Sequence, residues 1–259
     1  MFFDTHTHLH HQRFNQDRKE ILMRMRQNQI LQFLEIPIDF NSNFVMREKM
    51  GDFPDVRYAA GVHPTRTWRM EPDVKSVMRH IRRFARMENT VAIGEIGLDH
   101  HIPGTEEYWG IQEEWFHRFI ELSKEEHLPM VLHIRQAEED AIRILREHGS
   151  SHKGVVHCFN GSPELAEEYT GMGLLLGIGG CIAMGMEEME NAVKRIPLDF
   201  LVLETDCPFL SPDPSMNRNT PMSLPLIAQK IAKIKGISME EVEHVTTRNA
   251  LGLFENICH

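Results

Sequence analysis

FFDTHTH, residues 2–8, combines a short apolar run with two alternating histidines. Seven further apolar runs of strand length follow it, each separated from the next by a stretch long enough for a helix. They are ILQFLEIPI (30–38), VRYAAGV (56–62), VAIGEIG (91–97), PMVLHI (129–134), GVVHC (154–158), LLLGIG (174–179) and FLVLETD (200–206). Strands that alternate with helical segments indicate βα units. Eight such units predict an α/β protein with a (β/α)₈ barrel, formed as one domain over residues 1–259, whose active site lies at the carboxyl ends of the strands.

Helical periodicity and capping residues support the intervening helices. Apolar residues recur at helical spacing over residues 107–127 and again over 137–149. Ser162, followed by a proline and a glutamate, is typical of a helix start, and Ser238 opens a capping-box pattern. The seventh unit is the least regular, because residues 174–185 are rich in glycine and only a short helix follows.

Charge and composition exclude several function classes. The chain of 259 residues carries a formal charge of −10, which gives it no general attraction for nucleic acid or for an anionic membrane. An anionic substrate must therefore be held by a local positive site. The amino terminus lacks the features of a signal peptide, and no run approaches the length of a membrane span. We expect a cytoplasmic protein with no membrane association, and the sequence indicates no obligate protein partner.

The four cysteines, Cys158, Cys181, Cys207 and Cys258, form no CxxC pair, and their irregular spacing indicates reduced thiols. Cys158 and Cys207 each follow a candidate ligand. Successive side chains on a strand point to opposite faces, so we interpret both as packed thiols that face away from the lumen.

Six residues able to bind metal lie at or near the ends of the apolar runs. They are His6, His8, Glu95, His133, His157 and Asp206. An HxH pair or one histidine closing a strand is a weak signal, since most such residues are solvated or packed in a core. In a barrel, however, all six would meet in one small volume. Imidazole together with carboxylate suits zinc, manganese or iron, and a buried carboxylate needs such a cationic partner.

The chain resembles the TatD family of metal-dependent hydrolases over almost its full length. The segments that carry the resemblance are DTHTHL (4–9), GVHP (61–64), GEIGLD (94–99), LPMVLHIRQAEEDAIRIL (128–145), HCFNGSPELA (157–166), ETDCPFLSP (204–212), NTP (219–221) and RNALGLF (248–254). The resemblance implies nuclease activity, commonly 3′-to-5′ on DNA. It also implies that His6, His8 and Asp206 hold one metal, that the histidines closing the fifth and sixth runs hold the second, and that Glu95 bridges the two.

We therefore expect two divalent ions, Zn, Mn or Mg, and DNA ends or single strands as substrate. Asp206 is the candidate to orient or deprotonate the attacking water, with Glu95 and His63 completing the catalytic set. His63, Arg135 and Asn160 are candidates for substrate binding. For Arg135, an ion pair with an acid of the next helix is an equally good interpretation.

The other histidines receive no catalytic role. His10 and His11 are interpreted as loop residues, with a smaller chance of touching substrate. The remainder are expected on the surface or on helix faces: His80, His100, His101, His117, His127, His152 and His244.

Three alternative functions stay open. An amidohydrolase or lactonase of this fold often uses a carbamylated lysine as the bridge, but the only lysine between Thr90 and Arg135 is Lys124, inside a helix. A trinuclear phosphoesterase would want a further histidine near Asp206. A metal-stabilised binding protein without turnover would need only one closed site.

Overall fold

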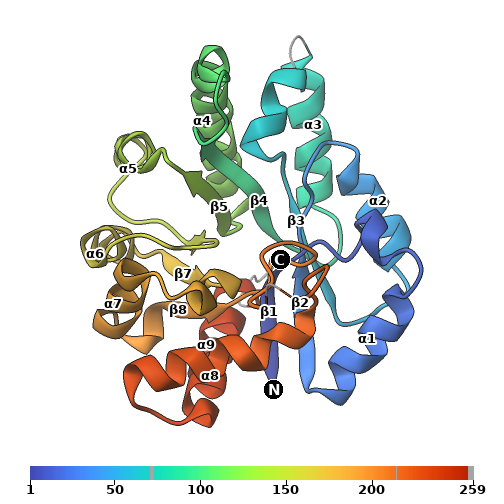
Figure 1. Cartoon of the computed structure of the whole chain (residues 1–259). Coiled ribbons are helices and arrows are strands. Elements are labelled where there is room, and N and C mark those ends of the chain that lie inside the picture. Colours follow the sequence, from blue (N-terminus) through green and yellow to red (C-terminus); the bar gives the residue numbers. More distant parts are fainter. Residues whose placement is uncertain (71–72, 214, 256–259) are drawn as a thin grey trace.

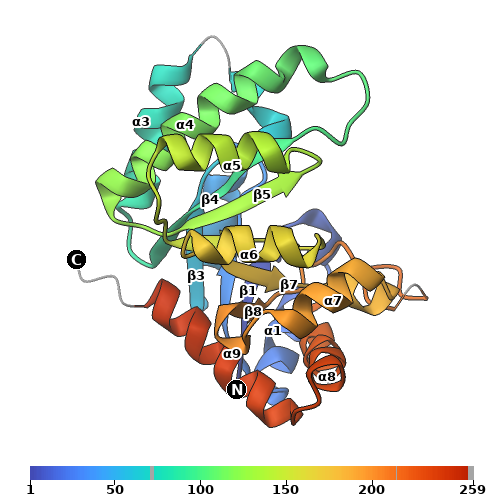
Figure 2. The ribbon, with the colours of Figure 1, turned by 90° about the vertical axis from the view of Figure 1, so that its left-hand side faces the viewer.

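The computed structural model describes residues 1–70, 73–213 and 215–255, and in these ranges eight parallel strands form one sheet in chain order (Figure 1). The strands are β1 (Phe2–Thr7), β2 (Ile30–Glu35), β3 (Val56–Ala60), β4 (Thr90–Asp99), β5 (Met130–Arg135), β6 (Gly154–Val156), β7 (Leu175–Ile178) and β8 (Leu201–Leu203). The α-helices are α1 (Arg18–Gln27), α2 (Ser42–Met50), α3 (Val74–Ala85), α4 (Trp109–Glu126), α5 (Glu138–Glu147), α6 (Pro163–Gly171), α7 (Glu187–Arg195), α8 (Leu224–Lys235) and α9 (Met239–Phe254). Helices surround the strands in both views, which confirms the predicted (β/α)₈ barrel (Figures 1 and 2).

The barrel closes where β1 meets the segment that follows β8. Thr7 and Cys207 form an isolated parallel bridge. Two backbone bonds flank it, from the Asp206 N–H to the His6 carbonyl at 2.9 Å and from the His8 N–H to the Cys207 carbonyl at 2.9 Å. The hydrogen bonds that close the barrel therefore also place the HxH motif beside Asp206.

Helix α9 covers the end of the barrel at which the strands begin. A cluster of buried apolar side chains takes Phe3, Val131 and Val202 from near the starts of their strands and adds Ala250 and Phe254 from α9. The rings of Phe3 and Phe254 lie 5.9 Å apart. This end is thus filled with apolar side chains, which leaves the carboxyl ends of the strands as the open face.

The helices begin close to where the sequence predicts. The segment 107–127 forms a short 3₁₀ turn, η3 (Glu106–Tyr108), followed by α4, and the segment 137–149 contains α5. The Ser162 hydroxyl accepts from the Leu165 N–H, and the Ser238 hydroxyl accepts from the Glu241 N–H, as the capping patterns predict. In the seventh unit a 3₁₀ segment, η4 (Gly180–Met184), stands between β7 and the short helix α7.

Within the described ranges, no helix has both the length and the apolar character that crossing a bilayer requires.

Candidate metal centre

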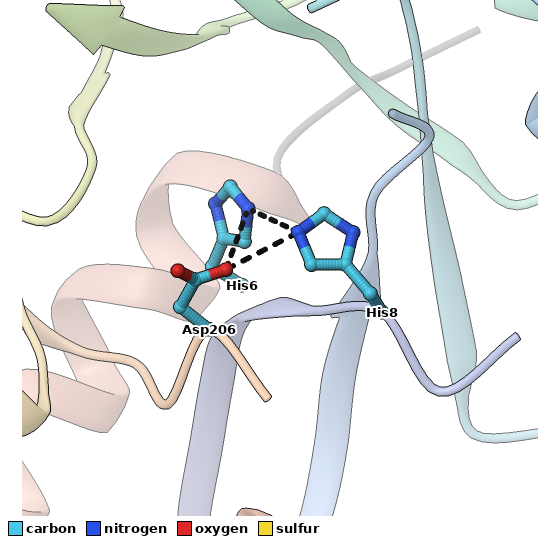
Figure 3. Close-up of side chains that lie close together, drawn as sticks. All are labelled: His6, His8 and Asp206. Atoms are coloured by element: carbon cyan, nitrogen blue, oxygen red, sulfur yellow. Dashed lines mark hydrogen bonds and ion pairs between the residues drawn. The ribbon is translucent and has the colours of Figure 1, made fainter. Parts of the chain in front are cut away.

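His6, His8 and Asp206 converge at the seam where the barrel closes (Figure 3). The Nε2 atoms of the two histidines lie 3.2 Å apart. One carboxylate oxygen of Asp206, Oδ1, lies 3.2 Å from Nε2 of His8 and 3.8 Å from Nε2 of His6. Two imidazole nitrogens and one carboxylate oxygen therefore point at a common volume, a donor set that suits a divalent transition metal.

Glu95 connects this group to a second one. Its Oε2 lies 3.5 Å from Nε2 of His6, on the side of the first group. Its Oε1 lies 2.9 Å from Nδ1 of His133, 3.1 Å from Nε2 of His157 and 3.6 Å from Nε2 of His63. Because the two oxygens of one carboxylate face different histidines, Glu95 has the placement that a bridging ligand needs.

The position of Glu95 along its strand differs from the sequence expectation. We expected this residue at a strand terminus, but β4 continues to Asp99 and pairs with β5 as far as Arg135. The extra pairing arises because the residues after Glu95 also fit a buried strand, and every position of β4 is buried. Glu95 consequently projects from within the strand and is 3% exposed.

In three of these histidines, the ring nitrogen that faces away from the centre lies at hydrogen-bond distance from an acceptor. Nδ1 of His8 lies 2.8 Å from the Ile36 carbonyl, Nδ1 of His157 lies 3.2 Å from Glu204, and Nε2 of His133 lies 2.9 Å from Asp99. A carbonyl only accepts, so Nδ1 of His8 carries a proton, and Nε2 is the atom that faces His6 and Asp206. Histidines that bind metal are oriented in this way, and the donors present therefore fit divalent cations.

Glu204 was missed by the sequence reasoning. It is fully buried, and its Oε1 accepts from the Cys158 N–H at 2.6 Å as well as contacting His157. Its Oε2 has no hydrogen-bond partner among the described residues. A Cβ on Gly177 would lie 2.1 Å from that oxygen, so the carboxylate fits only because position 177 is glycine. The available signal was the carboxylate two residues before Asp206 in LETD.

The carboxylates determine how the histidines titrate. Burial opposes protonation of His157, but Glu204 and Glu95 outweigh it and raise the pKa of His157 well above its usual value. Although burial favours the neutral acid, the histidines around Glu95 hold its pKa well below the usual range. The pKa of Asp206 is lowered likewise, chiefly by its hydrogen bond to His8 against the effect of burial. The site therefore concentrates negative charge, which protons balance here and divalent cations would balance equally well.

His63 differs from the other histidines of the centre. Its Nδ1 accepts from the Thr65 N–H at 3.2 Å, so the proton of the neutral ring lies on Nε2, the atom that faces Glu95. Burial lowers the pKa of His63 to about 3, which keeps the ring neutral. His63 is thus placed as a hydrogen-bond donor at the edge of the centre, although its nitrogen is also close enough to group with Glu95 and His133 as a possible ligand.

The two other predicted substrate residues lie at the same open face. Arg135 ends β5 and is half-buried, and Asn160 lies half-buried in the segment after β6. Within the residues that the structure describes, Arg135 forms no ion pair with Glu138 or Glu139, so the alternative interpretation of this arginine is not realised. Substrate binding by either residue stays a prediction.

His10 lies in the turn after the HxH motif, as expected of a loop residue, but this turn is buried. Its side chain is 5% exposed, and its Nδ1 lies 2.6 Å from Glu35. Glu35 also accepts from the Thr7 hydroxyl and from the Leu9 N–H. The buried carboxylate at the end of β2 therefore holds the loop that follows the HxH motif.

His152 is not a surface residue, because the turn before β6 buries it against the Leu145 carbonyl, 2.9 Å from Nε2.

Cys207 is buried in the core, and the sulfur of Cys158 lies 3.9 Å from that of Cys181. Cys158 and Cys207 are packed thiols, and neither belongs to a possible metal-binding group of the described residues. Cys258 lies outside those residues.

Comparisons with known proteins agree with this geometry. Residues 3–255 match the family described as TatD related DNase. The chain is 35% identical over 257 residues to the uncharacterized metal-dependent hydrolase YabD of Bacillus subtilis, covering 98% of this chain and 99% of that protein. It is 32% identical over 266 residues to the human deoxyribonuclease TATDN3, covering 99% and 95%.

A solved structure shows the same fold. The crystal structure of YJJV, a TatD homologue from Escherichia coli, superposes with a TM-score of 0.88 at 25% identity, covering 99% of this chain and 98% of that one. The family match, the relatives and the shared fold together establish that this chain belongs to the TatD-related DNase family and is a metal-dependent hydrolase.

Proposed function

We propose that this protein is a binuclear deoxyribonuclease that removes nucleotides from DNA ends in the 3′-to-5′ direction and prefers single strands. The observation that carries the proposal is Glu95, whose two carboxylate oxygens face two separate sets of histidines. The name of the human relative supports DNA as the substrate class.

The residues of the centre divide between two ions, Zn, Mn or Mg. His6, His8 and Asp206 would hold one, and His133 and His157 the other, with Glu95 shared. Such a pair lowers the pKa of a bound water and clamps the attacking and leaving oxygens of a phosphodiester. Glu95 and Asp206 would offset about half of the positive charge of two divalent ions, so a phosphate is attracted even though the chain carries −10.

Asp206 is proposed to accept the proton of the attacking water, and His63 to donate a hydrogen bond to the substrate. Asp206 is ionised because its pKa is lowered, and it lies at the mouth of the site with 9% exposure. It is therefore the group able to orient an attacking water and accept its proton. His63 presents an N–H at Nε2, which suits a hydrogen bond to a phosphate oxygen.

The distribution of arginines supports attack at strand ends. A protein that grips long duplex DNA neutralises several phosphates with basic side chains. Arg82 of α3 and Arg86, which directly follows this helix, do not form such a groove, because they pair with Glu125 and Glu126 of α4. Positive charge would instead be concentrated at the metal centre, in a barrel mouth that admits a terminus more easily than an internal segment.

The rival amidohydrolase chemistry has less support. Lys124 points its ammonium group at the His148 carbonyl on the outer helices and does not reach the centre. Glu95 occupies the bridging place instead.

A turnover screen tests the proposal. Protein loaded separately with Mg²⁺, Mn²⁺ or Zn²⁺ should be offered end-labelled single-stranded DNA, duplex DNA, RNA and a panel of cyclic amides. We expect single-stranded DNA to be shortened from its 3′ end faster than the other substrates. Turnover of a cyclic amide without any DNA cleavage would contradict the proposal.

A further inference from the structure

A pocket of about 200 Å³ lies beside the metal centre, between η2 (Pro64–Met70) and the start of α4. Two of its lining residues hold groups of the centre. The hydroxyl of Thr65 lies 2.8 Å from Nδ1 of His63. The amide of Gln112 bonds to both the backbone N–H and the carbonyl of Asp99, at 2.7 and 3.0 Å, and Asp99 anchors His133. The pocket is therefore a direct neighbour of the site at which a phosphodiester would be cleaved.

Flat aromatic surface forms one wall of this pocket. The rings of Trp68 and Tyr108 are stacked, with centroids 4.9 Å apart and planes 19° apart. The guanidinium of Arg69 lies over the Trp68 ring at 5.0 Å. All three side chains are at least partly exposed. Aromatic rings and guanidinium planes of this kind are the surfaces on which unpaired bases stack.

The arginines of the pocket have no acidic partner in the described part of the chain. Neither Arg66 nor Arg69 forms an ion pair there, whereas Arg82 of α3 and Arg86, which follows this helix, do. The carboxylate of Glu107 interacts with the Tyr108 hydroxyl and raises the pKa of Tyr108. A phosphate would thus be favoured on the arginine side of the pocket and disfavoured at the tyrosine hydroxyl.

We propose that this pocket binds a nucleotide of the single-stranded substrate next to the scissile bond. One base stacks against the Trp68–Tyr108 surface, and the adjoining phosphate contacts Arg66 or Arg69. This inference rests on the proposed function, because it assigns a subsite to the same reaction. Every base offers a π face, so the pocket selects unpaired strands over duplex without reading sequence.

Two measurements on Trp68→Ala, Arg66→Ala and Arg69→Ala test the subsite. The first is the kcat/KM for a short single strand, divided by the kcat/KM for bis(p-nitrophenyl) phosphate, a small diester without a base. The second is the anisotropy of a fluorescein-labelled oligonucleotide of deoxythymidine, titrated with metal-loaded protein. Arg24→Ala is the matched control, because Arg24 is exposed near the end of α1, away from the open face, and forms no side-chain hydrogen bond or ion pair among the described residues.

We expect Trp68→Ala to lower the ratio and to weaken oligonucleotide binding by roughly 5- to 150-fold, the range for loss of one stacked base, mainly through KM. Trp68→Phe should restore most of the loss, whereas Arg24→Ala should match wild type. Ratio and affinity unchanged in Trp68→Ala and in both pocket arginine variants would overturn the subsite. If the wild type cleaves no DNA, the proposed function fails, and the anisotropy decides the subsite. Weaker binding in Trp68→Ala with unchanged binding in Arg24→Ala supports the subsite, whereas equal binding in all variants, or no binding by the wild type, overturns it.

Discussion

Gly177→Ala tests how the buried Glu204 holds the metal centre. The new Cβ would lie 2.1 Å from Oε2 and 2.8 Å from Cδ of Glu204. Ordinary contacts between heavy atoms need about 3.5 Å, so the carboxylate oxygen must recede by about 1.4 Å. It would then lose its bonds to His157 and to the Cys158 N–H, which orient the ring toward Glu95.

Loss of a carboxylate that hydrogen-bonds to a metal-binding histidine typically weakens metal binding about 10- to 100-fold, which equals about 1.4–2.8 kcal/mol. Insertion of a methyl group into this packed position should also lower the free energy of unfolding by about 1–3 kcal/mol. Zinc affinity should be measured by competition with a chelator, beside the unfolding curve of the metal-free protein.

Gly171→Ala is the matched control. Gly171 is exposed in α6 and has open space around an added Cβ, so this variant should bind zinc like wild type. Glu204→Gln provides a second variant that keeps the volume and one acceptor oxygen, and it should show a smaller loss than Gly177→Ala. Wild-type zinc affinity in Gly177→Ala would refute the reasoning that Glu204 positions His157.

The remaining predictions concern the centre itself. Asp206→Asn should fold normally and lose turnover by about 10²–10⁴-fold, because it keeps size and removes the proton acceptor; near wild-type turnover at saturating metal would show that Asp206 has another role. Glu95→Ala should weaken both ions in a metal titration, whereas His157→Ala should mainly weaken one; the same pattern in both would contradict a bridge. Metal affinity should fall as pH falls, because ions must displace protons from His133 and His157, whose raised pKa values favour the protonated rings in the metal-free protein. A metal affinity that does not change with pH would contradict the role of His133 and His157 as ligands. The stability of the metal-free protein should change in the opposite direction. The contribution of these histidines to the free energy of unfolding is complete below their unfolded pKa of about 6.5 and is lost as pH rises through the raised values. Finally, a circular single strand should resist the enzyme while an end-labelled linear strand is degraded, and efficient cutting of the circle would refute attack at ends.

The sequence predicts the fold well because the strand signal is strong. Eight apolar runs lie at βα spacing, and all eight form strands that begin within a residue of the expected positions. The metal-binding candidates also converge as the barrel topology requires. Position along a strand was less predictable, as Glu95 shows, because apolar residues on both sides of it allow β4 to continue to Asp99.

The residues that sequence reasoning missed act through tertiary contacts. Glu35 and Glu204 are buried carboxylates whose partners, His10 and His157, lie far away in the chain, and no spacing rule connects them. Their common sequence signal is a charged residue within an apolar run, which demands a partner without identifying it. His152 was misassigned for the same reason, because its acceptor is a backbone carbonyl that only the folded turn brings near.

The central claim is that two ions share Glu95. Anomalous difference maps from crystals soaked in Mn²⁺ or Zn²⁺ test it most directly. We predict two peaks per chain, one among His6, His8 and Asp206 and the other between His133 and His157, with Glu95 between the peaks. A single peak at saturating metal, or two peaks of which Glu95 contacts only one, would contradict the account.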